Sequence, residues 1–298
     1  MRSNYLMRCA LTLLVTASLC CNASDMPRPV LVEPEPHAVM GGTMKLLISE
    51  KYNMMYCYIQ KNGCTQGVQL FLEASNQRVS GDVWSTWYNA PKHGAKHPGK
   101  HEPWSVTFPE QEVSAAWRND SFARIVYVRD PAERLLSGYL QKCKQAGQRS
   151  QHCIGFKDTS RPVPSFEEFV LALTPKSIHG NQHFMMQSQH CGLYNKSWKF
   201  NHIIDMSSPG FQTKVRQLYL DRGVAASVVN KNYPEHKSGN TGGHDTSAKQ
   251  KMTQFYGSSG RNNTLLNKVF KLFEQDYVLF DTLPQVDTDN WMFFPGRS

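Results

Sequence analysis

A buried strand that leads directly into a helix is the clearest structural signal in this sequence. Residues Phe122–Val128 (FARIVYV) form an apolar run rich in β-branched and aromatic residues, which is typical of a buried strand. Asp130 suits the N-cap of a helix, Pro131 suits its first position, and Glu133 completes the spacing of a capping box. The pattern therefore predicts a strand followed by a helix over residues 131–144.

The same alternation recurs along the chain. Further strands are predicted at residues 52–59, 202–205 and 277–280, and further helices at residues 65–74, 165–173, 211–221 and 265–276. Residues 80–120 read mostly as loop, because Trp, His, Pro and Gly are frequent there. Strands that alternate with helices favour an α/β fold with a mainly parallel sheet.

The charge of the chain indicates an anionic partner. The 298 residues are 40% hydrophobic and carry a formal charge of +9, so the chain can bury a core and still attract negative charge. Nucleic acid, a membrane surface, an acidic glycan and a phosphorylated cofactor all satisfy that charge. Only the N-terminus is apolar enough to consider as a membrane span, which excludes a polytopic membrane protein.

The N-terminus has the pattern of a secretory signal. Arg2 and Arg8 precede an apolar run from Cys9 to Cys21, and a small-residue exit ends at Ala23. Residues 1–23 are therefore expected to be a cleaved signal peptide or a short signal anchor. Either form places the rest of the chain in the secretory lumen, which argues against nucleic acid as the partner. A membrane-anchored form stays open, although the run is shorter than the usual span of about 20 residues.

A proline-rich stem and one large domain are expected after the signal. Residues 24–49 contain closely spaced prolines and read as a linker, while residues 50–298 are expected to form a single α/β domain. Loss of residues 1–23 removes two arginines and no acidic residue, which lowers the charge from +9 to +7.

An odd number of cysteines follows the signal. Five remain after residue 23, so one thiol stays free or pairs between chains in an oxidising compartment. Cys143 and Cys153, ten residues apart, are the natural local disulfide. Glycosylation sequons occur at Asn22, Asn119, Asn195 and Asn262.

The first candidate anion-binding loop joins the strand predicted at 52–59 to the helix predicted at 65–74. It reads Gln60-Lys61-Asn62-Gly63-Cys64-Thr65. A loop between a buried strand and a helix N-terminus aims unpaired backbone N–H groups at one point, which suits an anion. Gly63 allows close approach of the backbone, Lys61 adds charge and Thr65 adds a hydroxyl. An ordinary strand–turn–helix with a surface lysine has the same appearance, and the Walker A pattern of a nucleotide kinase is absent.

The second candidate loop follows the strand at 122–128. Arg129 stands where this strand leaves the sheet, a position at which open α/β sheets bind ligands, and its guanidinium can grip phosphate oxygens. Ser137, two turns into the helix, can add a hydroxyl. The alternative is structural: Asp130 caps the helix, and Arg129 or Arg134 pairs with Glu133.

Together the two loops resemble the cofactor signatures of the Golgi carbohydrate sulfotransferases, which use 3′-phosphoadenosine 5′-phosphosulfate (PAPS). VRDPAERLLSGY, residues 128–139, is similar throughout to the family pattern V-R-D-P-x-x-R-L-x-S-x-Y for the 3′-phosphate. KNGCT, residues 61–65, is similar to the 5′-phosphosulfate loop, although Gln60 replaces its usual proline and Gln66-Gly67 replaces Asn-Trp. Residues 183–191 resemble H-W-x-x-Q-x-x-x-C, and residues 273–280 resemble Y-x-x-D-x-x-x-F.

The resemblance implies a P-loop-like three-layer α/β fold, with a central, mainly parallel sheet flanked by helices. It implies in-line transfer of a sulfuryl group from PAPS to a glycan hydroxyl, without a covalent enzyme intermediate or a metal. Lys61 would stabilise the leaving phosphate oxygen, with Asn62, Gly63, Cys64 and Thr65 around the 5′-phosphate. Arg129 and Ser137 would hold the 3′-phosphate. The acceptor is expected to be an anionic glycan, in the Golgi lumen.

A base must also take the proton of the acceptor hydroxyl. His101 is the first candidate and His97 the second, because family members with a histidine base keep it between the two loops. The spacing of His93, His97 and His101 also suits a zinc site, but Gly94, Pro98 and Gly99 disfavour the helix that would align them. A third interpretation is a solvated basic loop, residues 92–101, that attracts an acidic glycan.

Several further residues have two open interpretations. Trp84, Trp87, Tyr88 and Trp104 can stack on sugars or belong to the core. His183 and Gln187 line a cleft or form a buried polar network. His236-Lys237-Ser238 is a cofactor loop or an ordinary surface loop. The competing function from another class is a non-catalytic glycan-binding protein on the same scaffold.

Overall fold

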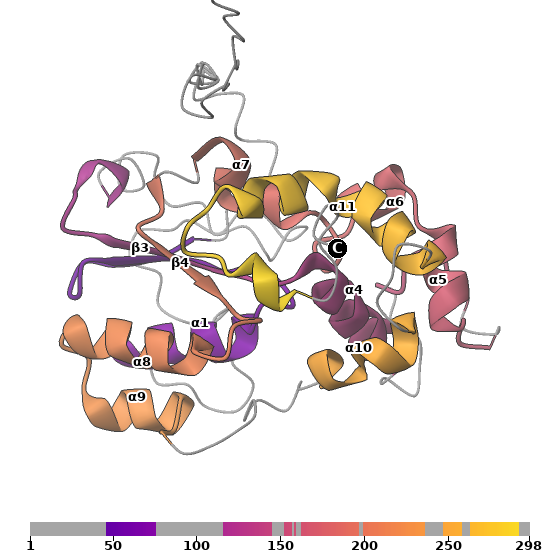
Figure 1. Ribbon diagram of the computed structural model, residues 1–298. Coiled ribbons are helices and arrows are strands. Elements are labelled where there is room, and N and C mark those ends of the chain that lie inside the picture. The colour runs from indigo at the N-terminus through magenta and orange to yellow at the C-terminus, as the bar shows by residue number, and fades with distance from the viewer. Residues whose placement is uncertain are drawn as a thin grey trace, which may run out of the picture. The chain divides into compact units, whose positions relative to one another are not determined.

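A computed structural model describes residues 46–75, 116–144, 152–156, 158, 162–196, 199–235, 247–257 and 263–291 (Figure 1). Its sheet contains β1 (Leu46–Ser49), β2 (Met54–Cys57), β3 (Ala123–Val128) and β4 (His202–Asp205), in that order across the sheet. β1 runs antiparallel to β2, whereas β2, β3 and β4 are parallel neighbours. The sheet is therefore mainly parallel, as predicted. Because β1 pairs with β2, residues 46–49 belong to the sheet, although they fall within the range expected for the stem.

Helices cover both faces of this sheet (Figure 1). The helices are α1 (Cys64–Ala74), α4 (Pro131–Tyr139), α5 (Phe166–Ala172), α6 (Pro175–His179), α7 (Leu193–Lys196), α8 (Phe211–Asp221), α9 (Ala226–Asn232), α10 (Ala248–Tyr256) and α11 (Thr264–Asp281). Shorter helical segments are the π-helix η3 (Leu140–Lys144) and the 3₁₀ helices η4 (Gln187–Gly192) and η6 (Thr288–Asn290).

Two hydrophobic cores lie on opposite faces of the sheet. Tyr56 and Tyr127 face one core, where they pack with side chains of α1, α8 and α9. Met55 and Val126, one position along the same strands, face the other core with side chains of α4, α10 and α11. Because successive strand residues point to opposite faces, this burial on both sides produces three layers. The three-layer α/β prediction is confirmed.

The start of α4 follows the predicted capping only in part. The Asp130 carboxylate accepts a hydrogen bond from the Ala132 N–H at 2.8 Å, and Pro131 is the first helical residue. Glu133 does not complete a capping box, because its carboxylate instead contacts the Arg129 guanidinium at 2.6 Å and the Ser207 hydroxyl at 2.9 Å. The Glu133 carboxylate therefore binds Arg129, which follows β3, and Ser207, which follows β4, and it does not cap the helix.

The strand predicted at residues 277–280 is wrong, because these residues form the end of α11. The buried positions Phe273, Tyr277 and Phe280 recur at helical spacing, while Val278 is exposed. A local kink at Phe273, with φ −119° and ψ 20°, divides the helix. A short apolar run is ambiguous between strand and helix, and here the helical burial pattern decides.

Gly67 in α1 leaves room for two tyrosines beneath the helix. A Cβ added to Gly67 would lie 2.9 Å from Tyr127 Cε2 and even closer to the Tyr56 hydroxyl, which real Cβ atoms do not tolerate. We expect Gly67→Ala to lower the free energy of unfolding by about 1–3 kcal/mol, as overpacked core variants do. Urea unfolding measures the change, and Gly180→Ala is the control, since only one distant backbone oxygen lies near its added Cβ. Equal stability of the two variants would contradict this packing.

Two disulfides fix distant segments to the sheet. Cys143–Cys153 confirms the predicted local pair. Cys57–Cys191 joins the end of β2 to η4 across 134 residues, a link that the sequence analysis did not find. Cys64 is a free thiol. Disulfides are consistent with a secretory-pathway protein.

Within the part of the chain that the structure describes, no helix combines the length and apolar character needed to cross a membrane.

Candidate functional site

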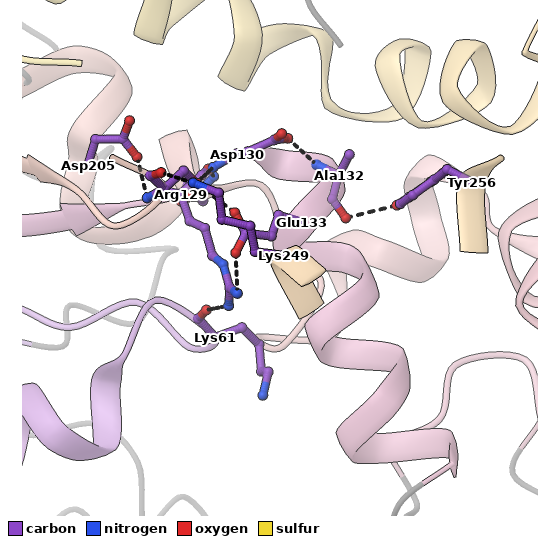
Figure 2. A network of polar contacts seen from close by, with 10 residues as sticks. Lys61, Arg129, Asp130, Ala132, Glu133, Asp205, Lys249 and Tyr256 are labelled. Atoms are coloured by element: carbon purple, nitrogen blue, oxygen red, sulfur yellow. Dashed lines mark hydrogen bonds and ion pairs between the residues drawn. The ribbon is translucent and has the colours of Figure 1, made fainter. Parts of the chain in front are cut away.

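The two predicted loops meet at one edge of the sheet. The first loop connects β2 to α1, and the second connects β3 to α4. Because β2 and β3 are parallel neighbours, their carboxyl ends lie together, where open α/β sheets bind ligands. Figure 2 shows Lys61 and Arg129 side by side, and the Arg129 Nη1 donates a hydrogen bond to the Lys61 carbonyl at 2.8 Å. The loops that the sequence analysis paired are thus in direct contact.

The first loop turns tightly before α1. Lys61 and Gly63 both adopt left-handed backbone conformations, with φ of 71° and 66°. Gly63 tolerates this φ and serves as the N-cap of α1, and it offers no side chain to the helical amides. Met206, which follows β4, lies against Gly63, since an added Cβ would be 3.4 Å from the Met206 Cε. The first-turn N–H groups of this eleven-residue helix are therefore uncapped by a side chain at the edge of the sheet.

Lys61 is held in an unusual state for a lysine. Only 9% of the residue is exposed, and its Nζ donates a hydrogen bond to Gln141 Oε1 at 2.9 Å. Burial lowers the pKa of Lys61 to about 7, the nearby Cys64 opposes this shift, and the Arg129 guanidinium adds to it. An anion beside this ammonium would favour its charged form.

Arg129 is buried between the two loops. Its Nη2 forms an ion pair with Glu133 at 2.6 Å, which is the pairing that the structural alternative predicted. Its Nη1 reaches the Lys61 carbonyl, and its Nε is buried without a hydrogen-bond partner among the described residues. The guanidinium is therefore fixed in place while it retains an unused donor.

Gln187 joins both loops from a third segment. Its Oε1 accepts hydrogen bonds from the Asn62 side chain at 2.6 Å and from the Arg129 N–H at 3.0 Å. Its Nε2 donates to the Arg129 carbonyl at 2.7 Å, while Asn62 also donates to the Tyr127 carbonyl at 2.8 Å. Gln187 and Asn62 are fully buried. For Gln187 the structure supports the buried polar network and not the cleft.

Asp276 on α11 fixes the segment that carries Gln187. Its carboxylate accepts hydrogen bonds from the N–H groups of Gln187 at 2.8 Å and Ser188 at 2.7 Å. Burial raises the pKa of Asp276, and these hydrogen bonds oppose the shift. The two weaker similarities of the sequence, residues 183–191 and 273–280, are thus parts of one buried network.

Arg134 is a structural residue, but its role differs from the pairing with Glu133 that the sequence left open. It is 2% exposed and bridges three backbone carbonyls, those of Gln60 at 2.9 Å, Met185 at 2.7 Å and Gln182 at 3.3 Å. Burial lowers its pKa to about 10. Arg134 therefore holds the first loop in place through the Gln60 carbonyl. Arg129, and not Arg134, pairs with Glu133.

A cavity of about 540 Å³ lies beside Arg129. Its wall includes Glu133 on α4, the residues after β4 and the faces of α8 and α10. The cations that line it are Arg129, Arg216 and Lys249. Ser207, which follows β4, is linked to the start of α4, because its hydroxyl accepts a hydrogen bond from the Asp130 N–H at 3.0 Å and donates one to Glu133. No sequence pattern indicated this cavity, since α8 and α10 meet the strand ends only in three dimensions.

Some of the remaining predicted site residues lie within the described ranges, and others lie outside them. Cys64 and Thr65 form the first turn of α1 and are half-buried, and Ser137 is buried in α4, one helical turn after Glu133. The half-buried His183 lies with its ring centroid 4.9 Å from that of His152. The predicted residues outside the described ranges are His93, His97, His101, Trp84, Trp87, Tyr88, Trp104 and residues 236–238. Within the described ranges, no cluster of three or more His, Cys, Asp or Glu residues could hold a metal ion.

The chain is thus an α/β protein in which two loops that carry cationic side chains meet at the carboxyl ends of adjacent parallel strands, where open sheets bind ligands. The family model described as the sulfotransferase family matches residues 44–281, and the chain belongs to this family. It is also similar to carbohydrate sulfotransferase 9 of Homo sapiens, with 29% identity over 98 residues. That similarity covers 33% of this chain and 20% of the relative. No solved structure matches the chain significantly.

Proposed function

We propose that this chain transfers a sulfuryl group from PAPS to a hydroxyl of a glycan by in-line displacement. The contact between the Arg129 guanidinium and the Lys61 carbonyl carries the proposal, because it brings both signature loops to one site. Membership of the sulfotransferase family and the similarity to a carbohydrate sulfotransferase support it. The competing function is a non-catalytic glycan-binding protein of the secretory lumen on the same scaffold.

The roles of the residues follow from what the reaction requires. Charge develops on the leaving phosphate oxygen, and a positioned cation or N–H group stabilises it. Lys61 would supply the cation, while Asn62 would hold the loop and Gly63–Thr65 would offer amides and a hydroxyl to the 5′-phosphate. Arg129 and Ser137 would bind the 3′-phosphate. When bound, PAPS supplies the sulfuryl group and departs as adenosine 3′,5′-bisphosphate, without a metal.

The catalytic base, the acceptor glycan and the location of the protein are proposed from the sequence. His101, and after it His97, would take the proton of the acceptor hydroxyl. The positive charge of the chain favours an anionic glycan. The N-terminal signal, cleaved or retained as an anchor, would deliver the domain to the Golgi lumen, with which the two disulfides agree.

Binding of adenosine 3′,5′-bisphosphate by titration calorimetry tests the proposed function. We expect the wild-type chain to bind this nucleotide and Arg129→Ala to bind it about a hundredfold more weakly, since a buried charge-assisted contact is lost. Arg222→Ala is the matched control: Arg222 Nη1 donates to the Ser121 carbonyl, before the opposite end of β3. The control should bind like the wild type.

Two results would count against the proposal at different levels. Absence of nucleotide binding by the wild-type chain removes the sulfotransferase assignment of this site. Binding without transfer of labelled sulfate to any glycan of a mixed library favours the non-catalytic alternative.

A further inference from the structure

The cavity beside Arg129 contains more positive than negative charge. Among the described residues, three cations line it, and two of them are paired with carboxylates that also line it. Arg129 pairs with Glu133 at 2.6 Å, and Arg216 pairs with Glu235 at 3.1 Å. The third cation, Lys249, has no carboxylate within ion-pair distance among the residues that the structure describes. Lys249 is therefore the source of the excess positive charge among the described lining residues.

Lys249 is placed by the contact between α10 and the loop after β4. It lies in the first turn of α10, and its Nζ donates a hydrogen bond to the Ser207 carbonyl. In Figure 2 its side chain lies beside Glu133. α10 itself is held against α4, because the Tyr256 hydroxyl donates to the Ala132 carbonyl at 2.8 Å. Lys249 thus lines the cavity from a helix that is itself held in place.

Two buried donors in the cavity wall also lack partners among the described residues. They are the Arg129 Nε and the Ser208 hydroxyl, and both residues are less than 10% exposed. Buried polar atoms are almost always hydrogen-bonded, so unpaired donors that line a cavity indicate a missing polar ligand. Lys249, which forms no ion pair with a described carboxylate, lines the same cavity, so the ligand indicated is an anion rich in oxygen atoms.

We propose that Lys249 binds the 3′-phosphate of the nucleotide and makes the site selective for nucleotides that carry it. This inference rests on the proposed function. Of the residues assigned to the two phosphates, Arg129 lines the cavity, whereas Ser137 and residues 60–65 do not line it within the described ranges. The cavity is lined by Arg129 and by residues of α8 and α10, so a phosphate bound there would have both Arg129 and Lys249 in the surrounding wall. Lys249 would exchange the Ser207 carbonyl for phosphate oxygens.

The test compares two nucleotides that differ only in the 3′-phosphate. Titration calorimetry on the full chain with its disulfides intact gives affinities for adenosine 3′,5′-bisphosphate and adenosine 5′-monophosphate. We expect Lys249→Met to weaken binding of the bisphosphate by about tenfold to a hundredfold, the usual effect of losing one charge-assisted contact. Binding of the monophosphate should change by less than about twofold, and Lys249→Arg should retain most of the preference.

Lys214→Met is the matched control. Lys214 is an exposed lysine on α8 that does not line the cavity within the described residues, and its loss should change neither affinity. An equal loss of both affinities in Lys249→Met, or no loss of either, would overturn the inference and leave the proposed function intact. Equal wild-type affinity for both nucleotides would overturn it as well. Absence of binding of both nucleotides by the wild type would instead remove the proposed function, and this inference with it.

Discussion

Replacing Lys61 by glycine is expected to abolish sulfate transfer and at the same time to raise the stability of the empty protein. The loss of transfer should reach about a thousandfold or more, since one preorganised group at a developing charge contributes about a hundredfold to a thousandfold and cofactor positioning is lost as well. The measurements are single-turnover transfer of labelled sulfate and thermal unfolding of the nucleotide-free chain.

The gain in stability has two sources. Lys61 occupies a left-handed conformation, φ 71°, which costs a residue with a Cβ about 1–2 kcal/mol and costs glycine little. Its ammonium is also buried, which lowers its pKa to about 7. Because the folded state binds this proton less tightly than the unfolded chain, the penalty is present in full near and below pH 7. It fades as the pH rises toward 10.5, the ordinary lysine value.

A second variant separates these sources. Lys61→Ala removes the charge but keeps the backbone strain, so it should be less stable than Lys61→Gly by about 1 kcal/mol at every pH. The advantage of both variants over the wild type should be larger at pH 6.5 than at pH 9.5. Variants that are clearly less stable than the wild type at pH 6.5 would show that the Lys61 environment is not strained.

Replacing Gln187 by leucine is expected to disable both loops from a position that touches no ligand. The variant leaves the N–H and carbonyl of Arg129 without partners and removes one of two acceptors of the Asn62 amide. Each buried group left unpaired costs about 1–3 kcal/mol, so the free energy of unfolding should fall by about 3–5 kcal/mol. The affinity for adenosine 3′,5′-bisphosphate should fall at least tenfold, because Arg129 is no longer fixed.

Two further variants test this network. Gln187→Glu keeps the acceptor at Oε1 but cannot donate to the Arg129 carbonyl, so it should also be destabilised. Gln189→Leu is the control: Gln189 is half-buried two positions away, and its side chain forms a hydrogen bond with His179 and not with either loop. It should retain nearly normal stability and affinity. If Gln187→Leu behaves like this control, the network does not hold the loops.

The sequence predicted the elements whose signals are local. The strand at 202–205 and the helix at 211–221 have the predicted bounds, because their apolar patterns and the Gly223 stop signal are contained within each segment. The strand before Arg129 and the disulfide Cys143–Cys153 were predicted for the same reason. The adjacency of the two loops also followed, since parallel neighbouring strands bring their carboxyl ends together.

The sequence could not predict the contacts made between distant segments. Arg129 and Arg134 were both candidates to pair with Glu133, and only the packed fold decides that Arg129 forms the pair and Arg134 becomes a backbone anchor. The carboxylate of Asp276 lies 89 residues from the Gln187 N–H that it accepts from. Lys249 resembles any surface lysine until α10 is placed beside Ser207. These contacts depend on tertiary packing, which local propensity does not report.

The disulfide between Cys57 and Cys191 gives the site a dependence on its compartment. It ties the last residue of β2 to a position four residues beyond Gln187, so the strand that leads into the first loop and the segment that fastens both loops share one covalent link. A chain still in a reducing environment lacks that link. Nucleotide binding is therefore expected to be weaker in a reduced chain than in an oxidised one, so that the site is complete only in an oxidising compartment.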